Sequence, residues 1–453
     1  MTVVCTGVVL SSLDLFIVNV ALPQIAEGFH GATLADLSWV LNAYAVVFAA
    51  FLVPAGRLAD RAGRRGGFLV GVAVFTIASA ACAASTSVGM LVAFRIVQAL
   101  GAALLVPTSL GLVLAAYPPE RRAGAVRVWA ATSGLAAAAG PVLGGLLVQA
   151  SWRWVFIVNV PIGIAAIVVG RRVLPRIPAE GGPLPDLAGA GLLAGGIGAL
   201  TLGLVEANSW GWGSWRVAAV LAAAVASIAL FLRRSRSHAS PILESSLWHE
   251  RRYAIAVAAT ALFSMAFGAM LLSIVLWLQE DWGWSALRAG LAVAPGPLMV
   301  PGISLLSGRL IPRFGSGGVI AAGCAFFAGG VFWWETAIGV RPDYLGDAVG
   351  GMLLTGIGVG LAFPTLFATA ASALPPARFA TGAAVINMAR QIGFAVGVAV
   401  FVAVIGAPNT ASARLVGFQH GWLVIAGTAA GAAFVALALN VRRAVAVPAP
   451  VEA

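Results

Sequence analysis

The run Leu13-Asp-Leu-Phe-Ile-Val-Asn-Val-Ala-Leu-Pro23 lies in an apolar stretch that begins at Thr2 and is long enough to cross a lipid bilayer. Its single carboxylate, Asp14, stands among aliphatic side chains. An ionisable group in hydrocarbon is costly and usually serves a function. We therefore interpret residues 3–24 as a membrane-spanning helix with a protonatable acid. We expect this helix to be retained, because no basic segment precedes it as in a signal peptide.

The composition of the chain is that of a membrane protein. Of its 453 residues, 60% are hydrophobic and only 9% are charged, and the mean hydropathy is +0.98. These values exclude a soluble globular protein. A span needs about 20 apolar residues. The sequence predicts about fourteen, near 3–24, 37–56, 67–86, 89–116, 125–148, 154–172, 187–206, 216–232, 254–278, 287–307, 318–339, 347–373, 381–405 and 422–440.

The positive charges report the orientation of these spans. The net charge of +11 comes entirely from arginine, clustered in short loops, so it indicates topology rather than a nucleic-acid partner. Twenty arginines fall in the loops on the side of the N-terminus, and five fall on the other side: Arg153, Arg216, Arg288, Arg341 and Arg414. The positive-inside rule then predicts a multi-pass protein of the inner (plasma) membrane with both termini in the cytoplasm.

Two segments of the chain recur. Gly56-Arg-Leu-Ala-Asp-Arg-Ala-Gly63 aligns with Gly308-Arg-Leu-Ile-Pro-Arg-Phe-Gly315, and residues 106–121 align with 363–378 at nearly the same offset. The fold class is therefore an all-α polytopic membrane protein with a six-helix bundle at 1–176, two inserted helices at 187–232 and a second six-helix bundle at 254–441. Paired repeats are typical of alternating-access carriers, which place the substrate site between the repeats.

Four motifs in the first repeat carry a family resemblance. They are the Asp14 run, Gly56–Arg65, Arg95-Ile-Val-Gln-Ala-Leu-Gly101, and the stretch from Gly134 to Gly140-Pro-Val-Leu-Gly-Gly145. With them the chain resembles the major facilitator superfamily, and within it the fourteen-span drug:proton antiporters of multidrug efflux. The resemblance implies proton-coupled export of amphipathic organic compounds or drugs. It also implies that the first and fourth helices are neighbours.

Asp14 and Arg95 are the predicted coupling pair. Asp14 lies about 17 Å above the cytoplasmic side and Arg95 about 10 Å below the outer boundary, so in a core about 30 Å thick the two have similar depths. We expect a water-facing pair in which protonation and substrate binding compete. The alternatives are that Asp14 bonds Asn19 in helix packing, and that Arg95 only binds helix carbonyls. The candidate substrate-cavity residues are Asn19, Gln98, Arg390 and Gln391.

Two further groups complete the predicted site. The loop after the second helix predicts a cytoplasmic gate in which Asp60 pairs with Arg64 or Arg127; the alternative is an ordinary basic turn. Its residues are Gly56, Asp60, Arg61, Gly63, Arg64 and Arg127. The resemblance implies that the fifth-helix motif marks antiporters, whereas the alternative is plain small-residue packing. Its residues are Gly134, Gly140, Pro141, Gly144 and Gly145.

The leading hypothesis is a monomeric secondary active exporter that exchanges a small amphipathic organic substrate for protons across the lipid bilayer. Because no GxxxxGK[ST] pattern occurs, we expect the proton gradient rather than ATP to supply the energy. We expect no enzymatic activity, no cofactor and no nucleic-acid partner. We also expect no metal site, because the three cysteines are scattered singly. The rival hypotheses are a proton-coupled symporter that imports a nutrient and a non-transporting membrane sensor or scaffold.

Overall fold

The computed structural model describes residues 1–29, 31–175, 181, 183–375, 378–406 and 410–440. Within these ranges the chain is helical apart from short connections and contains no strand. The elements are α1 (Thr2–Gly28), α2 (Leu34–Ala62), α3 (Arg64–Ala83), α4 (Val88–Ala116), α5 (Pro119–Val148), α6 (Trp154–Ile157), α7 (Asn159–Val173), α8 (Leu187–Val205), α9 (Ala207–Trp210), α10 (Trp215–Ser237), α11 (Ser245–Trp248), α12 (Arg251–Leu276), η1 (Trp277–Asp281), α13 (Ala286–Val293), α14 (Pro295–Ala337), η2 (Tyr344–Ala348), α15 (Val349–Ser372), α16 (Phe379–Ile405) and α17 (Ala411–Leu437), where η1 and η2 are π-helical turns.

The long helices begin at side chains that cap them. Thr33 accepts a hydrogen bond from the Asp36 amide at 3.1 Å, and the Asp36 carboxylate accepts one from the Thr33 amide at 2.9 Å. This reciprocal capping box satisfies donors that the first turn of α2 leaves free. Ser87 caps α4 with a single bond, in which its hydroxyl accepts from the amide of Met90 at 3.2 Å. Beyond the caps, apolar helices are the favoured structure because a bilayer offers the backbone no other hydrogen-bond partners.

Thirteen helical segments of the described chain are long and apolar enough to cross a membrane. One of them, Ala286–Ala337, has 52 residues and would extend about 78 Å as a straight helix, far more than the bilayer core. Gly315 breaks it with a φ of 71° and a ψ of 161°. Counted on either side of this kink, the segment contains the two spans predicted at 287–307 and 318–339. The total then agrees with the prediction of about fourteen.

Several boundaries differ from the predicted ones. The fifth helix begins at Pro119 rather than near 125, and the sixth predicted span divides into α6 and α7. The predicted boundary at 232 falls inside α10, and α12 starts three residues before 254. The boundaries at 176 and 441 lie outside the described residues. Helix ends extend beyond hydrocarbon into water, so apolarity alone does not locate them.

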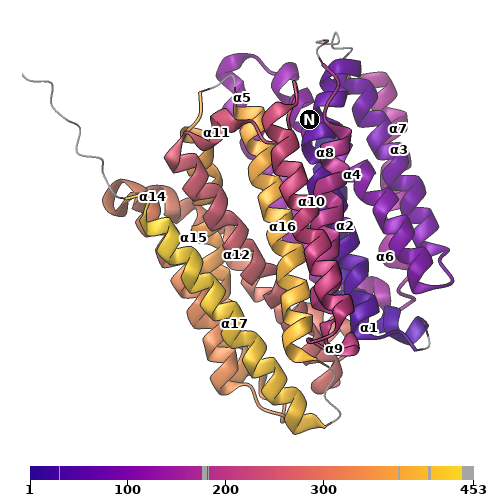
Figure 1. Ribbon diagram of the computed structural model, residues 1–453, viewed down its shortest axis with the longest axis vertical. Helices are drawn as coiled ribbons and strands as arrows, with labels where there is room; N and C mark the ends of the chain where they lie inside the picture. Colours follow the sequence, from indigo (N-terminus) through magenta and orange to yellow (C-terminus); the bar gives the residue numbers. More distant parts are fainter. Residues whose placement is uncertain (30, 176–180, 182, 376–377, 407–409, 441–453) are drawn as a thin grey trace, which may run out of the picture.

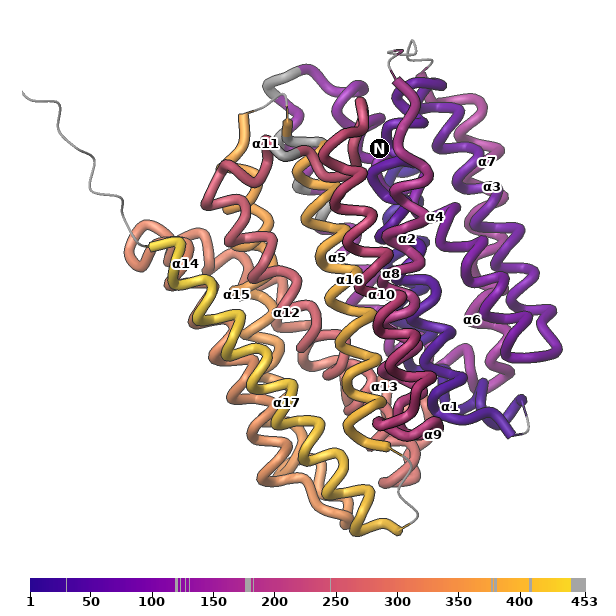
Figure 2. The backbone as a smooth tube through the Cα atoms, in the orientation of Figure 1, coloured from indigo at the N-terminus to yellow at the C-terminus, as the bar shows by residue number. Residues whose placement is uncertain are grey.

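The helices form two sets, in which α1–α5 and α7 pack on one another and α12–α17 pack on one another (Figure 1). The sets meet where α2 lies against α16 and where α5 lies against α13. The inserted helices α8 and α10 pack together, and α8 contacts both α2 and α16. In the tube view the inserted pair runs alongside α16, in front of α2 (Figure 2).

The two sets are joined at the face opposite the N-terminus. Gln24 of α1 donates from Nε2 to Oε1 of Gln279 in η1 at 2.8 Å, and Gln279 donates to the Val20 carbonyl at 3.0 Å. We call this end of the molecule the opposite face and the other end the N-terminal face. The orange and yellow helices α14, α15 and α17 lean away from the indigo and purple helices toward the N-terminal face (Figure 1).

Candidate functional site

The centre of the first helix set holds an ion pair between α1 and α4. Arg95 donates from Nη1 to Oδ2 of Asp14, and neither side chain exposes any surface. Asp14 lies twelve residues after Thr2, and Arg95 lies seven residues after Val88 at the start of the antiparallel α4. The structure thus brings into direct contact the two charges whose depths match in the sequence.

Three polar side chains extend the ion pair into a network. Gln98, one turn beyond Arg95, donates to Oδ1 of Asp14 at 2.9 Å and to the Ser79 hydroxyl at 2.8 Å. Its own oxygen accepts from Nη1 of Arg95 at 2.6 Å. Asn159, at the start of α7, donates to Oδ1 of Asp14 at 3.3 Å. Asp14 therefore accepts from two helices of the first set, α4 and α7, rather than from Asn19.

The Arg95 guanidinium is enclosed by α2 and α6. Its Nε donates to the Val40 carbonyl at 3.0 Å, and its central carbon lies 4.2 Å from the Tyr44 ring centroid and 5.9 Å from that of Phe156. Cation–π contacts of this kind replace part of the lost hydration of a buried guanidinium. The expectation of a water-facing pair is therefore wrong for this conformation, because aromatic rings and neighbouring helices cover both charges.

The remaining cavity candidates differ in exposure. Gln98 belongs to the enclosed network, and Asn19 and Gln391 are also buried, with 3% of each exposed. The Asn19 amide nitrogen has no partner among the described residues. Arg390 is partly exposed. It lies on α16, which packs against α2, the helix that holds Tyr44.

The predicted gate residues lie around the junction of α2 and α3. Asp60 accepts from Nε of Arg64 at 2.6 Å, and both side chains are partly exposed. Gly63 makes the turn between the helices with a φ of 106°. Gly56 packs close to Pro107 of α4, and Arg61 belongs to the last turn of α2. The side chain of Arg127 lies outside the described part of the structure.

A second contact at this face was not predicted. Arg57 donates to the Glu244 carboxylate at 2.7 Å, to the Ser240 hydroxyl at 2.8 Å and to the Pro241 carbonyl at 2.7 Å. It thereby fastens the segment between α10 and α12 to the end of α2. Sequence gave no signal for this contact, since the partners are more than 180 residues apart.

Three glycines of α5 allow close contacts with neighbouring helices. A Cβ on Gly140 would collide with Phe16 of α1, and one on Gly145 would lie 2.5 Å from the Ala286 carbonyl oxygen of α13. A Cβ on Gly144 would lie 3.0 Å from the Ile17 carbonyl oxygen. Gly134 has no neighbouring atom within 4 Å of such a Cβ. Pro141 lies inside α5, where its carbonyl faces Gly290.

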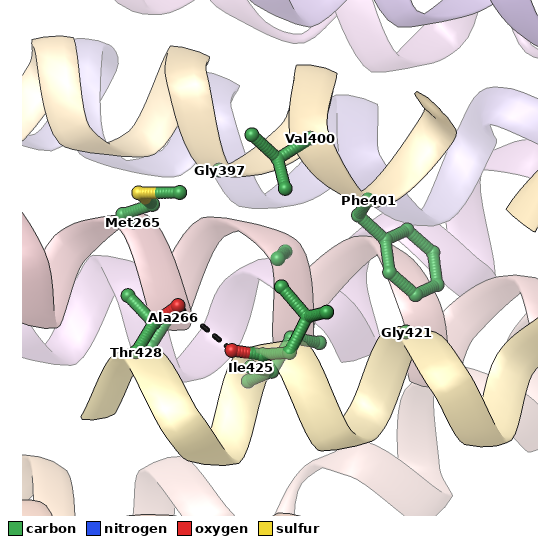
Figure 3. Close-up of a pocket in the computed structure, with 10 residues that line it drawn as sticks. Met265, Ala266, Gly397, Val400, Phe401, Gly421, Ile425 and Thr428 are labelled. Atoms are coloured by element: carbon green, nitrogen blue, oxygen red, sulfur yellow. Dashed lines mark hydrogen bonds between the residues drawn. The ribbon is translucent and has the colours of Figure 1, made fainter. Parts of the chain in front are cut away.

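The described residues give no support to a proton site in a small pocket of the second helix set or to a metal site. A small pocket between α12, α16 and α17 is lined by apolar groups such as Met265, Phe401 and Ile425, and Thr428 turns its hydroxyl to the Val424 carbonyl (Figure 3). None of its lining residues is ionisable, so it offers a proton no site. In the described chain no group of three or more His, Cys, Asp or Glu side chains is arranged to hold a metal ion.

Comparison with known proteins shows which family and which proteins this chain is similar to. Residues 4–398 match the model of the Major Facilitator Superfamily. The tetracenomycin C resistance and export protein of Streptomyces glaucescens is 37% identical over 74% of this chain, but the match spans only 62% of that protein. The methylenomycin A resistance protein of Bacillus subtilis is 34% identical over 88% of this chain and 85% of its own length. The multidrug resistance protein Stp of Mycobacterium tuberculosis is 33% identical over 90% of this chain and 76% of its own.

Solved structures share the fold at low identity. A peptide transporter POT in complex with sulfate superposes with a TM-score of 0.71 over 97% of this chain and 94% of that one, at 16% identity. The human organic anion transporter MFSD10 superposes with a TM-score of 0.66 over 96% of this chain and 98% of that one, at 17% identity.

Proposed function

This chain is a multi-pass membrane protein of the major facilitator superfamily, and from that premise we propose that it exports amphipathic organic compounds in exchange for protons. The names of its relatives support export, since they describe proteins of antibiotic resistance, multidrug resistance and export. We further propose that it lies in the inner membrane with the N-terminal face toward the cytoplasm.

The enclosed Asp14–Arg95 pair is the observation that carries proton coupling. When Asp14 gains a proton it loses its charge, and the Arg95 cation is left enclosed with only neutral partners such as Val40 and Gln98. An unpaired charge in a low-dielectric interior costs several kcal/mol, about 3–5 when one member of a buried pair is removed. Protonation of Asp14 therefore favours a different packing of the helices around Arg95.

Exchange follows if the cargo favours the packing that the proton disfavours. The closed ion pair belongs to a conformation whose two helix sets are joined at the opposite face by Gln24 and Gln279. Cargo that stabilises this conformation and a proton that destabilises it compete through the conformational equilibrium. One charge that crosses the membrane gains about 2.3 kcal/mol per 100 mV, which is comparable with the cost of leaving Arg95 unpaired.

The test is proton-driven efflux from proteoliposomes loaded with neutral, anionic and cationic amphipathic dyes. An imposed proton gradient is expected to drive efflux of at least one dye by the wild type. Asp14→Asn, which cannot exchange a proton, abolishes this efflux. Asp36→Asn is the matched control, because Asp36 is an exposed capping residue whose side chain accepts from the Thr33 amide, and the amide replacement keeps an acceptor oxygen. Normal proton-driven efflux by Asp14→Asn refutes coupling through that residue.

The direction of flux separates this proposal from its rival within the same fold. A nutrient symporter accumulates its substrate on the side toward which protons move, whereas an exchanger moves cargo against the proton flow. The same proteoliposomes decide between them when the gradient is reversed.

A further inference from the structure

Arg390 is a cation between the two helix sets, and no described residue supplies it with an anionic partner. Its side chain is partly exposed, and its Nε atom is enclosed without an acceptor among the described residues. No ion pair of the described chain includes it. It lies eleven residues, about 17 Å of helix, beyond Phe379 at the start of α16, which matches the depth of Asp14 in α1.

The charges at this depth do not cancel. Asp14 neutralises Arg95 through their direct contact, so the positive charge of Arg390 is left unbalanced. Tyr44 lies on α2, which packs against the α16 helix that holds Arg390; its ring lies beneath Arg95, and its buried hydroxyl has no partner in the described chain. Like charges repel strongly where the effective dielectric constant is low, so a cationic cargo is disfavoured here.

Exchange for a proton also disfavours an anionic cargo. A proton on Asp14 makes the centre more positive and strengthens the binding of an anion. Anion and proton would then bind together, which is the opposite of exchange. A cargo exchanged for protons at this centre is therefore neither a cation nor a free anion, but an uncharged molecule that can accept hydrogen bonds from a guanidinium.

Aromatic rings supply an apolar surface at a similar depth. Phe16 of α1 lies 6.3 Å from Phe267 of α12, and Phe267 lies 5.4 Å from Phe363 of α15, all between ring centroids. All three side chains are partly exposed, and they come from both helix sets. Rings that meet edge to face in this way suit contact with a flat aromatic molecule.

We propose that Arg390, with the Tyr44 hydroxyl, binds oxygen acceptors of an uncharged aromatic cargo and excludes lipophilic cations. This inference rests on the proposed exchange function and names its substrate class. Guanidinium groups are suited to it because they present several donors in a fixed plane and stay charged.

Three probes with one ring system test the proposal: anthraquinone, anthraquinone-2-carboxylate and an anthraquinone with a trimethylammonium-methyl substituent. Their binding to the full-length protein in nanodiscs is measured by equilibrium dialysis. The wild type is expected to bind the neutral probe at least tenfold more tightly than either charged one. Arg390→Gln weakens neutral binding about tenfold and removes the preference over the cation, because it removes both the charge and the guanidinium donors.

Two further variants and a control keep the result interpretable. Arg390→Lys retains the charge, so it excludes the cation even if Arg390→Gln does not fold. Tyr44→Phe removes only the unpartnered hydroxyl and weakens neutral binding while the cation stays excluded. Arg309→Gln, an exposed arginine of α14, leaves all three affinities unchanged. Equal binding of cation and neutral probe by the wild type overturns the proposal, as does tightest binding of the carboxylate.

Efflux of the neutral probe separates this inference from the proposed function. If the binding pattern holds but a proton gradient drives no efflux, the exchange function is wrong and the preference of the site stands. If proton-driven efflux occurs while Arg390→Gln keeps the wild-type preference, the exchange function stands and the role of Arg390 is refuted.

Discussion

Asp14 and Arg95 form an ion pair between α1 and α4 in which neither side chain has any exposed surface. The pair is closed by hydrogen bonds from Gln98 and Asn159 to the Asp14 carboxylate. Such enclosure makes each charge depend on the other, because neither can be solvated when its partner is lost. The pair is therefore a structural element as well as the proposed proton site, and the two roles can be measured separately.

Removal of Arg95 alone is expected to be more harmful than removal of both charges. Arg95→Gln leaves the Asp14 carboxylate enclosed without a cation and should destabilise the protein by about 3–5 kcal/mol. The Asp14→Asn/Arg95→Gln double variant leaves no enclosed charge and should recover part of that loss. Thermal unfolding in detergent micelles measures all three proteins. A double variant no more stable than Arg95→Gln contradicts a dependence of one charge on the other.

The contact of α5 with α13 is expected to hold the opposite face closed. Gly145→Ala places a methyl group 2.5 Å from the Ala286 carbonyl oxygen, where only backbone movement relieves the overlap. Overpacking of this kind costs typically about 1–3 kcal/mol. We expect it to separate the two helix sets at this face, as measured by the distance between spin labels on Thr86→Cys and Arg341→Cys, two exposed positions of the loops at that face.

Gly134→Ala is the control for this prediction, since its added methyl group meets no atom within 4 Å. It should leave the label distances unchanged. If Gly145→Ala gives the same distances as Gly134→Ala, the close contact does not hold the helix sets together.

Much of the architecture was predictable because hydrocarbon imposes simple rules. Apolar runs of helix length predict the spans. The positions of Asp14 and Arg95 along antiparallel helices predict that the two charges lie at similar depths. The two predicted spans on either side of Gly315 form one long helical segment. The chain stays helical on both sides of the kink at Gly315, so no loop separates the two spans. The roles of the predicted site residues in coupling and gating stay predictions.

Side-chain neighbours across the helix bundle could not be predicted. Asn159 is recognisable in the sequence as the polar residue of an otherwise apolar span, but its position does not indicate a contact with Asp14. Nothing in the position of Tyr44 in the sequence distinguishes it, although its ring lies beneath Arg95. The enclosure of the ion pair could not be predicted from the sequence either. The pattern of apolar residues does not show which surfaces cover a given charge.

The contact of Arg57 with Glu244 is expected to restrain the segment before α12. Its two side chains are partly exposed, so the pair should add no more than about 1 kcal/mol to stability. Arg57→Gln, which also loses the bonds to Ser240 and Pro241, should mainly free this segment. We expect trypsin to cut faster at Arg251 or Arg252 in this variant. Arg309→Gln serves as control, and cleavage at an equal rate in both variants would falsify the restraint.

Asp186 is expected to make stability depend on acid pH. It caps α8 by accepting from the Gly189 amide at 2.8 Å, and it pairs with Arg234 of α10 at 2.6 Å. Burial acts to raise the pKa of this carboxyl, but the hydrogen bonds from Arg234 and Gly189 and the nearby positive charge outweigh it and leave the pKa below the ordinary 3.8.

A depressed pKa in the folded state means that the unfolded chain takes up the proton first as the pH falls. The stabilisation by Asp186 is therefore complete above pH 3.8 and is lost as the pH falls through the lower pKa of the folded protein. Asp186→Asn keeps an acceptor for the cap but has no charge for Arg234. Its unfolding temperature should lie below that of the wild type at pH 5 to 6, and the difference should shrink as the pH falls below 3.8, because the unfolded wild-type chain then takes up a proton that the folded protein binds only at its lower pKa. A difference that stays constant down to pH 3 would show that Asp186 acts through its hydrogen bonds alone.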